Sequence, residues 1–93
     1  MIRTFADRDT ENVWKRVYVR RWGTDVQRAA YRKLLLIEAA ETLEDLTVPP
    51  GNRLEKLAGD RKGQHSVRIN SQWRICFVWR DGYAEKVEIT DYH

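Results

Sequence analysis

The 93-residue sequence has few of the residues that form disulfides or bind structural metals: one cysteine, Cys76, and two histidines. A single cysteine excludes an intrachain disulfide, and so few ligands cannot assemble a Cys/His zinc site. No apolar run reaches the roughly 18 residues that cross a bilayer, and the first residues lack the hydrophobic segment of a signal peptide. A Gly-rich phosphate loop and a Gly-x-Ser-x-Gly motif are also missing. We therefore expect a cytoplasmic protein without membrane segments, metal sites or cofactors.

Arginine and hydrophobic residues are well represented in this chain, whose length suits one domain, residues 1–93. Hydrophobic residues make up 42% of it, which is enough for one core. Lysine and arginine together number 17 against 14 acidic residues, so the net charge is +3, and twelve of the 17 are arginine. Because a guanidinium group binds phosphate bidentately, this excess favours a phosphate-bearing partner. An arginine-rich genome explains the composition equally well.

The first half of the chain shows the apolar spacing of helices. Residues 1–6 alternate apolar and polar and predict a short strand, and a helix capped at position 9 or 10 is expected to run to about position 22. A glycine ends this helix. Thr24 with Gln27 then matches a capping box for a second helix, from position 25 to about 46. Two helices joined so closely are expected to form an antiparallel hairpin.

The second half, beyond the helix-ending pair Pro49 and Pro50, has the alternating pattern of strands. The pattern predicts a three-stranded antiparallel meander, with one face covered by the helices, and strands at 65–69, 72–79 and 83–90. The expected fold class is therefore α+β, two helices packed on a small antiparallel sheet.

Three-residue loops between these strands keep the Trp and Ile side chains on one face, since a one-residue slip would exchange the faces. They place Arg68 opposite Arg74, and Arg74 opposite Glu88. Like charges directly opposed repel unless an anion or a carboxylate lies between them. The two arginines therefore belong either to a surface ion network with Glu88 or to a phosphate-binding face, and the pattern leaves both open.

Other polar residues are candidates for binding or catalysis. Two basic segments are either solvated surfaces or landing surfaces for a polyanion: Arg16, Arg20 and Arg21 in the first helix, and Arg53, Lys56, Arg61 and Lys62 ahead of the sheet. The last three residues, Asp91, Tyr92 and His93, can all exchange protons. Terminal residues are often frayed, and a final histidine can be the remnant of a tag.

Four stretches of the second half carry a family pattern: PPGNRLE at 49–55, GDRKGQHSVRIN at 59–70, QWRICF at 72–77 and VEITDYH at 87–93. They resemble the HigB group of RelE-type toxins. The N-terminal residues 2–5 and the two-helix pattern agree, so the resemblance spans the whole chain. It implies a RelE-like fold, with a two-helix N-terminal hairpin packed on a small antiparallel sheet.

The resemblance also implies a function. Such a protein is the toxin of a type II toxin–antitoxin system and cleaves translated mRNA on the ribosome, without a metal, by attack of the ribose 2′-OH. A HigA-type helix-turn-helix antitoxin neutralises it and represses their shared operon, so operator DNA is contacted only through the complex. The basic first helix and the segment 53–62 are then expected to face ribosomal RNA.

By position, the resemblance assigns Arg68 and Arg74 to the sheet arginines that hold the mRNA phosphate. It assigns the catalytic segment to the last residues, Asp91, Tyr92 and His93. Some members carry His where this chain has Glu55, so the choice of acid and base among these groups stays open. The alternatives are an inactive RelE-like module that binds RNA or an antitoxin, and an adaptor with no nucleic-acid role.

Overall fold

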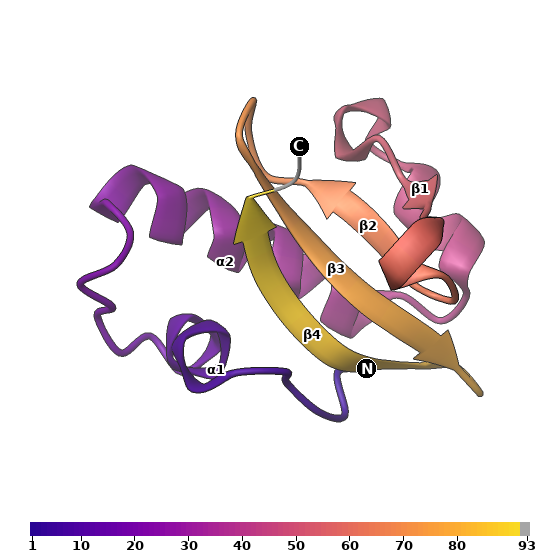
Figure 1. Ribbon diagram of the computed structural model, residues 1–93, viewed down its shortest axis with the longest axis horizontal. Helices are drawn as coiled ribbons and strands as arrows, with labels where there is room; N and C mark the ends of the chain where they lie inside the picture. The colour runs from indigo at the N-terminus through magenta and orange to yellow at the C-terminus, as the bar shows by residue number, and fades with distance from the viewer. Residues whose placement is uncertain (92–93) are drawn as a thin grey trace.

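The computed structural model describes residues 1–91 and shows helices packed on a four-stranded antiparallel sheet of order β1-β2-β3-β4 (Figure 1). The predicted α+β fold is confirmed. Two short 3₁₀ turns, η1 and η2, connect α2 to the sheet, and a third, η3, lies between β1 and β2. The bounds are α1 (Arg8–Trp14), α2 (Thr24–Ala39), η1 (Leu43–Thr47), η2 (Pro50–Asn52), β1 (Glu55–Lys56), η3 (Gly59–Arg61), β2 (His65–Arg68), β3 (Trp73–Arg80) and β4 (Tyr83–Asp91). None of the helices in this part of the chain is long and apolar enough to span a membrane.

The first helix is shorter than the sequence pattern predicts. Asp7 caps it by accepting a hydrogen bond from the N–H of Thr10 at 2.6 Å. The helix ends at Trp14, and Arg16 adopts the left-handed conformation with φ of 63°. The expected helix to position 22 is therefore wrong, because the chain leaves the helix early and buries Trp22 separately in the core.

A nine-residue connection, 15–23, replaces the expected tight turn between the helices. Gln27 organises it. Its side-chain amide accepts from the N–H of Val19 at 3.0 Å and donates to the carbonyls of Val19 and Trp22 at 2.8 and 2.7 Å. The predicted capping box of Thr24 and Gln27 is consequently wrong: Gln27 holds the loop, and α2 starts without a side-chain cap.

The second helix ends at Ala39, not near position 46, and the chain continues into η1. Three of its buried residues, Ala30, Leu34 and Ile37, are fully shielded and pack into the core beneath the sheet. Figure 1 shows α2 behind the sheet. The core face predicted for the strands is confirmed, since its central members Ile75, Phe77 and others are buried.

The N-terminal segment lies along the edge of β4 rather than forming a full strand. Parallel bridges join Ile2 to Ala84 and Phe5 to Val87. Further along, the hydroxyl of Thr10 accepts a hydrogen bond from the N–H of Ile89 at 3.0 Å. These contacts cover an edge whose unpaired backbone groups would otherwise be exposed.

The strand register agrees with the prediction between β2 and β3, where Arg68 lies opposite Arg74. Between β3 and β4 it differs. The turn has two residues, Asp81 and Gly82, with φ of 53° and 83°, as a type I′ turn requires. A bulge between Cys76 and Val78 shifts the pairing again, so Glu88 lies opposite Cys76 and not opposite Arg74.

The other face of the sheet is partly covered, not fully solvated. β1 is the edge strand beside β2, and the short turn η3 that follows it crosses in front of the sheet (Figure 1). Under it, Ser66 and Cys76 are fully buried, and Arg74 is 9% exposed. The predicted exposed face is therefore restricted to the sheet end at which Arg68 emerges. The strand β1, which pairs Glu55 with Ser66, was not predicted.

Candidate functional site

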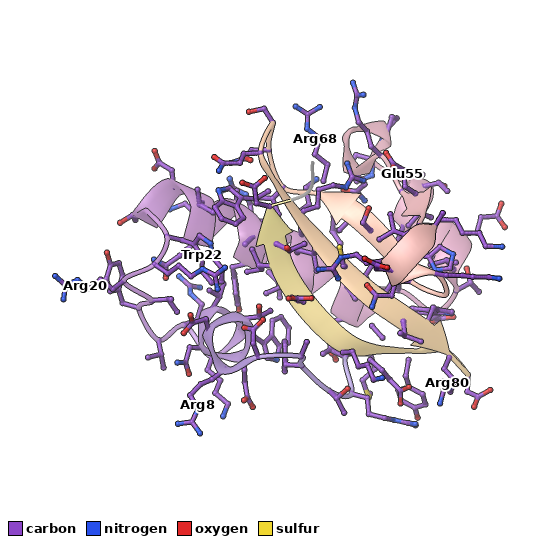
Figure 2. All side chains as sticks on the ribbon, viewed as in Figure 1. Arg8, Arg20, Trp22, Glu55, Arg68 and Arg80 are labelled. Atoms are coloured by element: carbon purple, nitrogen blue, oxygen red, sulfur yellow. The ribbon has the colours of Figure 1, made fainter. Side chains whose placement is uncertain are left out.

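A polar groove of about 290 Å³ lies where β1, β2 and the β2–β3 loop meet. Arginine and amide side chains dominate its lining, which consists of Arg53, Glu55, Arg68, Asn70, Ser71, Gln72 and Arg74. Figure 2 shows Arg68 and Glu55 at the same end of the sheet. The structure thus brings together Glu55, Arg68 and Arg74, three residues proposed from the sequence.

Arg74 is the most firmly held of the groove arginines. Its Nε donates to the hydroxyl of Ser66 at 2.8 Å, and its Nη2 donates to the backbone carbonyl of Arg53 at 2.7 Å. The carboxylate of Glu55 lies 3.9 Å from Nη2. Because the planar N–H donors of a guanidinium match phosphate oxygens, Arg74 is a candidate for binding an anion in this groove.

The carbonyl that Arg74 contacts is presented by an unusual backbone conformation. Arg53, which follows η2, has φ and ψ of 45° and 54°. This left-handed region is disfavoured for residues other than glycine and is uncommon outside turns and functional sites. Here it ends the 3₁₀ turn and directs the carbonyl of Arg53 at the guanidinium of Arg74.

Arg68 is held differently. Its Nε donates to the carbonyl of Asn70 at 2.9 Å, within the loop that follows β2, and its side chain is half-buried. The predicted position of Glu88 opposite Arg74, on which the alternative of an ion network with the two arginines depended, is wrong, because Glu88 lies opposite Cys76. Glu88 instead forms an ion pair with Arg61 at 3.1 Å. The two sheet arginines consequently face a groove in which Glu55 is the lining carboxylate.

The loop between β2 and β3 supplies lining residues that the sequence analysis missed. Asn70 shapes this loop, since its Oδ1 accepts from the N–H groups of Gln72 and Trp73, both at 2.8 Å. Gln72 in turn donates from Nε2 to the carboxylate of Asp91 at 3.1 Å, which places Asp91 at the rim of the groove. An Asn followed by polar residues predicts a turn but gives no signal of a lining role. The candidates Tyr92 and His93 lie outside the described residues.

Comparison with known proteins identifies the family. A family model described as "RelE-like toxin of type II toxin-antitoxin system HigB" matches residues 3–93. The chain belongs to this family. The resemblance drawn from the sequence is thereby confirmed, and the groove lies within the matched region.

Individual relatives of this HigB-like toxin agree. "Toxin HigB-1" of Vibrio cholerae serotype O1 is 46% identical over 61 residues, 66% of this chain and 64% of that protein. "Endoribonuclease HigB" of Proteus vulgaris is 39% identical over 41 residues, 44% and 45% of the two chains. The chain thus spans less than two thirds of either relative. A YoeB–YefM complex from Staphylococcus aureus has the same fold, with a TM-score of 0.64, 17% identity and coverage of 100% and 98%.

The basic residues predicted to contact ribosomal RNA fall into two groups in this HigB-like toxin. One group, in the segment that runs from η2 to η3, comprises Arg53, which lines the groove, and Lys56, Arg61 and Lys62. The other lies in the connection between the helices, not in a helix as expected, and comprises Arg16, Arg20 and Arg21. Figure 2 shows Arg20 at the left end of the molecule, away from Arg68 at the top and Glu55 at the upper right.

Two arginines of the connection between the helices have partners. Arg16 stacks over the ring of Tyr31, with 4.3 Å to the centroid, and Arg21 lies 3.9 Å from Asp9. Arg20 is exposed, with no ion pair among residues 1–91. A second hollow beside this connection, of about 200 Å³, has no carboxylate or imidazole in its lining.

Two titratable side chains of the neighbouring strands β2 and β3 lie outside the groove lining. Burial raises the pKa of the Cys76 thiol, which lies close to Arg61, Glu88 and Arg74. Burial and, to a smaller extent, the charge of Lys56 lower the pKa of His65. Over the described range, no cluster of three or more His, Cys, Asp and Glu side chains is arranged to hold a metal ion.

Proposed function

We propose that this chain is an endoribonuclease toxin that cleaves mRNA on the translating ribosome and so stops translation and growth. The observation that carries the proposal is the groove, in which three guanidinium groups and one carboxylate are gathered at the open end of the sheet. Three cations against one anion suit a phosphodiester and leave one group, Glu55, that can exchange a proton. The Proteus vulgaris relative bears the name endoribonuclease.

The reaction needs no more than proton transfer and charge stabilisation. A base removes the proton of the ribose 2′-OH, and the 2′-oxygen attacks phosphorus. The bond to the 5′-oxygen breaks, and an acid protonates that oxygen, which leaves a 2′,3′-cyclic phosphate and a 5′-OH. Arg68 and Arg74 bind the scissile phosphate and stabilise the additional negative charge of the transition state. No step of this scheme requires a metal ion.

The acid and the base come from two places in the chain. Glu55 lines the groove and is one candidate. The others belong to the C-terminal segment, in which Asp91 is linked to the groove rim through Gln72. We assign base or acid function to His93, oriented by Asp91, and substrate stacking or proton donation to Tyr92, following the family pattern.

The partners follow from the same proposal. The toxin binds mRNA and ribosomal RNA, and the basic residues beside the groove supply salt-sensitive contacts to RNA. A HigA-type helix-turn-helix antitoxin neutralises it, and operator DNA is bound only through that complex. The structurally similar Staphylococcus aureus protein is described as part of a YoeB–YefM complex, which supports a protein antitoxin.

The test is to map mRNA 5′ ends after brief expression and in a reconstituted translation reaction. The wild-type chain should generate new 5′ ends within translated messages, and Arg74→Ala should remove them. Arg80→Ala is the matched control, because Arg80 is exposed and lies far from Arg68 in Figure 2. Intact transcripts with retained ribosome binding would support the inactive binding module instead, and the absence of any salt-dependent ribosome binding would support the adaptor.

A further inference from the structure

We propose that Ser66 and the left-handed backbone of Arg53 are positioning groups that hold the guanidinium of Arg74 in a single orientation toward the groove. The family resemblance does not assign either group the role of positioning this arginine. The proposal concerns the geometry of Arg74 itself. Its consequence for cleavage rests on the proposed nuclease function.

Two separate anchors define the plane of the Arg74 guanidinium. Nε is bound to the hydroxyl of Ser66 at 2.8 Å and Nη2 to the carbonyl of Arg53 at 2.7 Å. Because the guanidinium is planar and rigid, hydrogen bonds from two of its nitrogens fix its rotation and its tilt. The anchors therefore determine the direction in which the remaining N–H groups point.

The surrounding fold holds both acceptors in place. Ser66 is fully buried on β2, beside β3, so its hydroxyl has a fixed position relative to the Arg74 backbone. The Arg53 carbonyl is fixed by the left-handed conformation at the end of η2, where the N–H of Arg53 also bonds the carbonyl of Pro50 at 3.1 Å. Arg74 is correspondingly 9% exposed although it lines a groove.

The opposed arginine provides an internal contrast. Arg68 donates from Nε to the carbonyl of Asn70, and over residues 1–91 it has no second side-chain hydrogen bond. It is also more exposed than Arg74. The groove therefore pairs one arginine whose orientation is set before substrate arrives with one whose orientation can still adjust. Preorganised donors of the first kind act most strongly in a transition state.

Ser66 is inaccessible to substrate, so it acts through Arg74 and is a positioning residue. The first experiment measures hydrogen exchange of the Arg74 Nε–H in ¹⁵N-labelled protein, with Arg74→Lys to assign the signal. We expect Ser66→Ala to accelerate this exchange by about tenfold or more, since the buried acceptor is lost. Ser66→Thr, which retains the hydroxyl, should restore slow exchange. Unchanged exchange in Ser66→Ala would overturn the proposal.

The second experiment tests the backbone of Arg53. Arg53→Ala and Arg53→Gly both remove the side chain, but only glycine adopts φ of 45° without strain. Exchange of the Arg74 Nη2–H that donates to this carbonyl should thus be faster in the Ala variant than in the Gly variant. Equal rates in the two would contradict the role of the left-handed carbonyl. This pair also decides the matter if the Ser66 variants fail to fold.

The activity measurement connects the geometry to function. On ribosomes, Ser66→Ala should lower kcat for mRNA cleavage by roughly tenfold and leave KM nearly unchanged, because orientation matters more in the transition state than in binding. Recovery of kcat in Ser66→Thr supports positioning. If the wild-type chain cleaves nothing but Arg74 exchange still responds to Ser66→Ala, the nuclease proposal fails while the positioning proposal stands.

Discussion

The role of Glu55 can be tested because removing its charge should change binding and cleavage in opposite directions. The change is Glu55→Gln, which keeps the size of the side chain. If Glu55 exchanges a proton with the substrate, cleavage should fall by about 10²- to 10⁴-fold, the usual contribution of a general acid or base. Binding of RNA should become stronger, because the groove loses the carboxylate of its lining.

The size of the binding effect follows from the position of Glu55. Its carboxylate is 3.9 Å from Nη2 of Arg74, and its side chain is 51% exposed. A phosphate held by Arg74 would lie about 6 Å from that carboxylate, where two unit charges in a water-like medium repel by about 0.7 kcal/mol. Removing this repulsion should tighten binding by about threefold. The exposure of Glu55 argues against a larger value, since solvent screens the pair.

The assay measures both quantities on the same protein. Cleavage is followed by the appearance of mRNA 5′ ends on ribosomes, and binding by the affinity for a 2′-deoxy oligonucleotide, which lacks the attacking hydroxyl. Glu44→Gln, an exposed carboxylate on η1, is the control and should change neither. If Glu55→Gln cleaves as fast as the wild-type chain or faster, Glu55 serves only to moderate the charge of the arginines and the acid–base reasoning is refuted.

Two further predictions concern stability. Thr10→Val removes the hydroxyl that accepts a hydrogen bond from the buried N–H of Ile89, and it should lower the free energy of unfolding by about 1–3 kcal/mol. Thermal denaturation should show a smaller loss of stability for Thr10→Ser, which keeps the hydroxyl. Equal losses in the two variants would contradict a hydrogen-bonding role. Burial and Lys56 lower the pKa of His65 below its ordinary value of 6.5, so protonation favours the unfolded state. Chemical denaturation should therefore show stability decreasing as the pH falls below about 6.5, and His65→Gln should weaken that dependence; an unchanged pH profile would exclude His65 as its source.

The sequence predicted the charged residues of the groove better than the contacts that hold them in place. Arg68 and Arg74 were placed opposite each other by loop length and alternation alone, because a sheet has only two faces. Glu55 entered through the family resemblance. The anchors of Arg74 could not be foreseen, since they depend on a left-handed conformation at Arg53, and nothing in an Arg at that position favours it. Burial of Ser66 likewise depends on how the chain ahead of β2 folds across the sheet.

The end of the first helix also could not be predicted from the sequence pattern. Its apolar spacing predicts a continuous helix to position 22, and each residue there tolerates helix individually. Burial of Val19 and Trp22 is achieved instead by a loop whose backbone groups bond to Gln27. Local pattern cannot report such a contact, because Gln27 belongs to the following helix and the bond forms only when the two segments are packed.

The register between β3 and β4 explains why the groove remains positively charged. The two-residue turn shifts the pairing by one from the expected register, which alone would place Ile89 opposite Arg74 and turn a core residue outward. The bulge, where two residues of β4 lie opposite Phe77, adds a second shift. After two shifts, the side chains of β4 return to the faces of the sheet that the sequence predicted for them. Ile89 therefore pairs with Ile75 in the core, and Arg74 lies opposite Thr90 instead of Glu88. Without the bulge, Arg74 would move away from Glu88 only if Ile89 turned out of the core. With the bulge, Ile89 stays in the core and Thr90, which carries no charge, lies opposite Arg74.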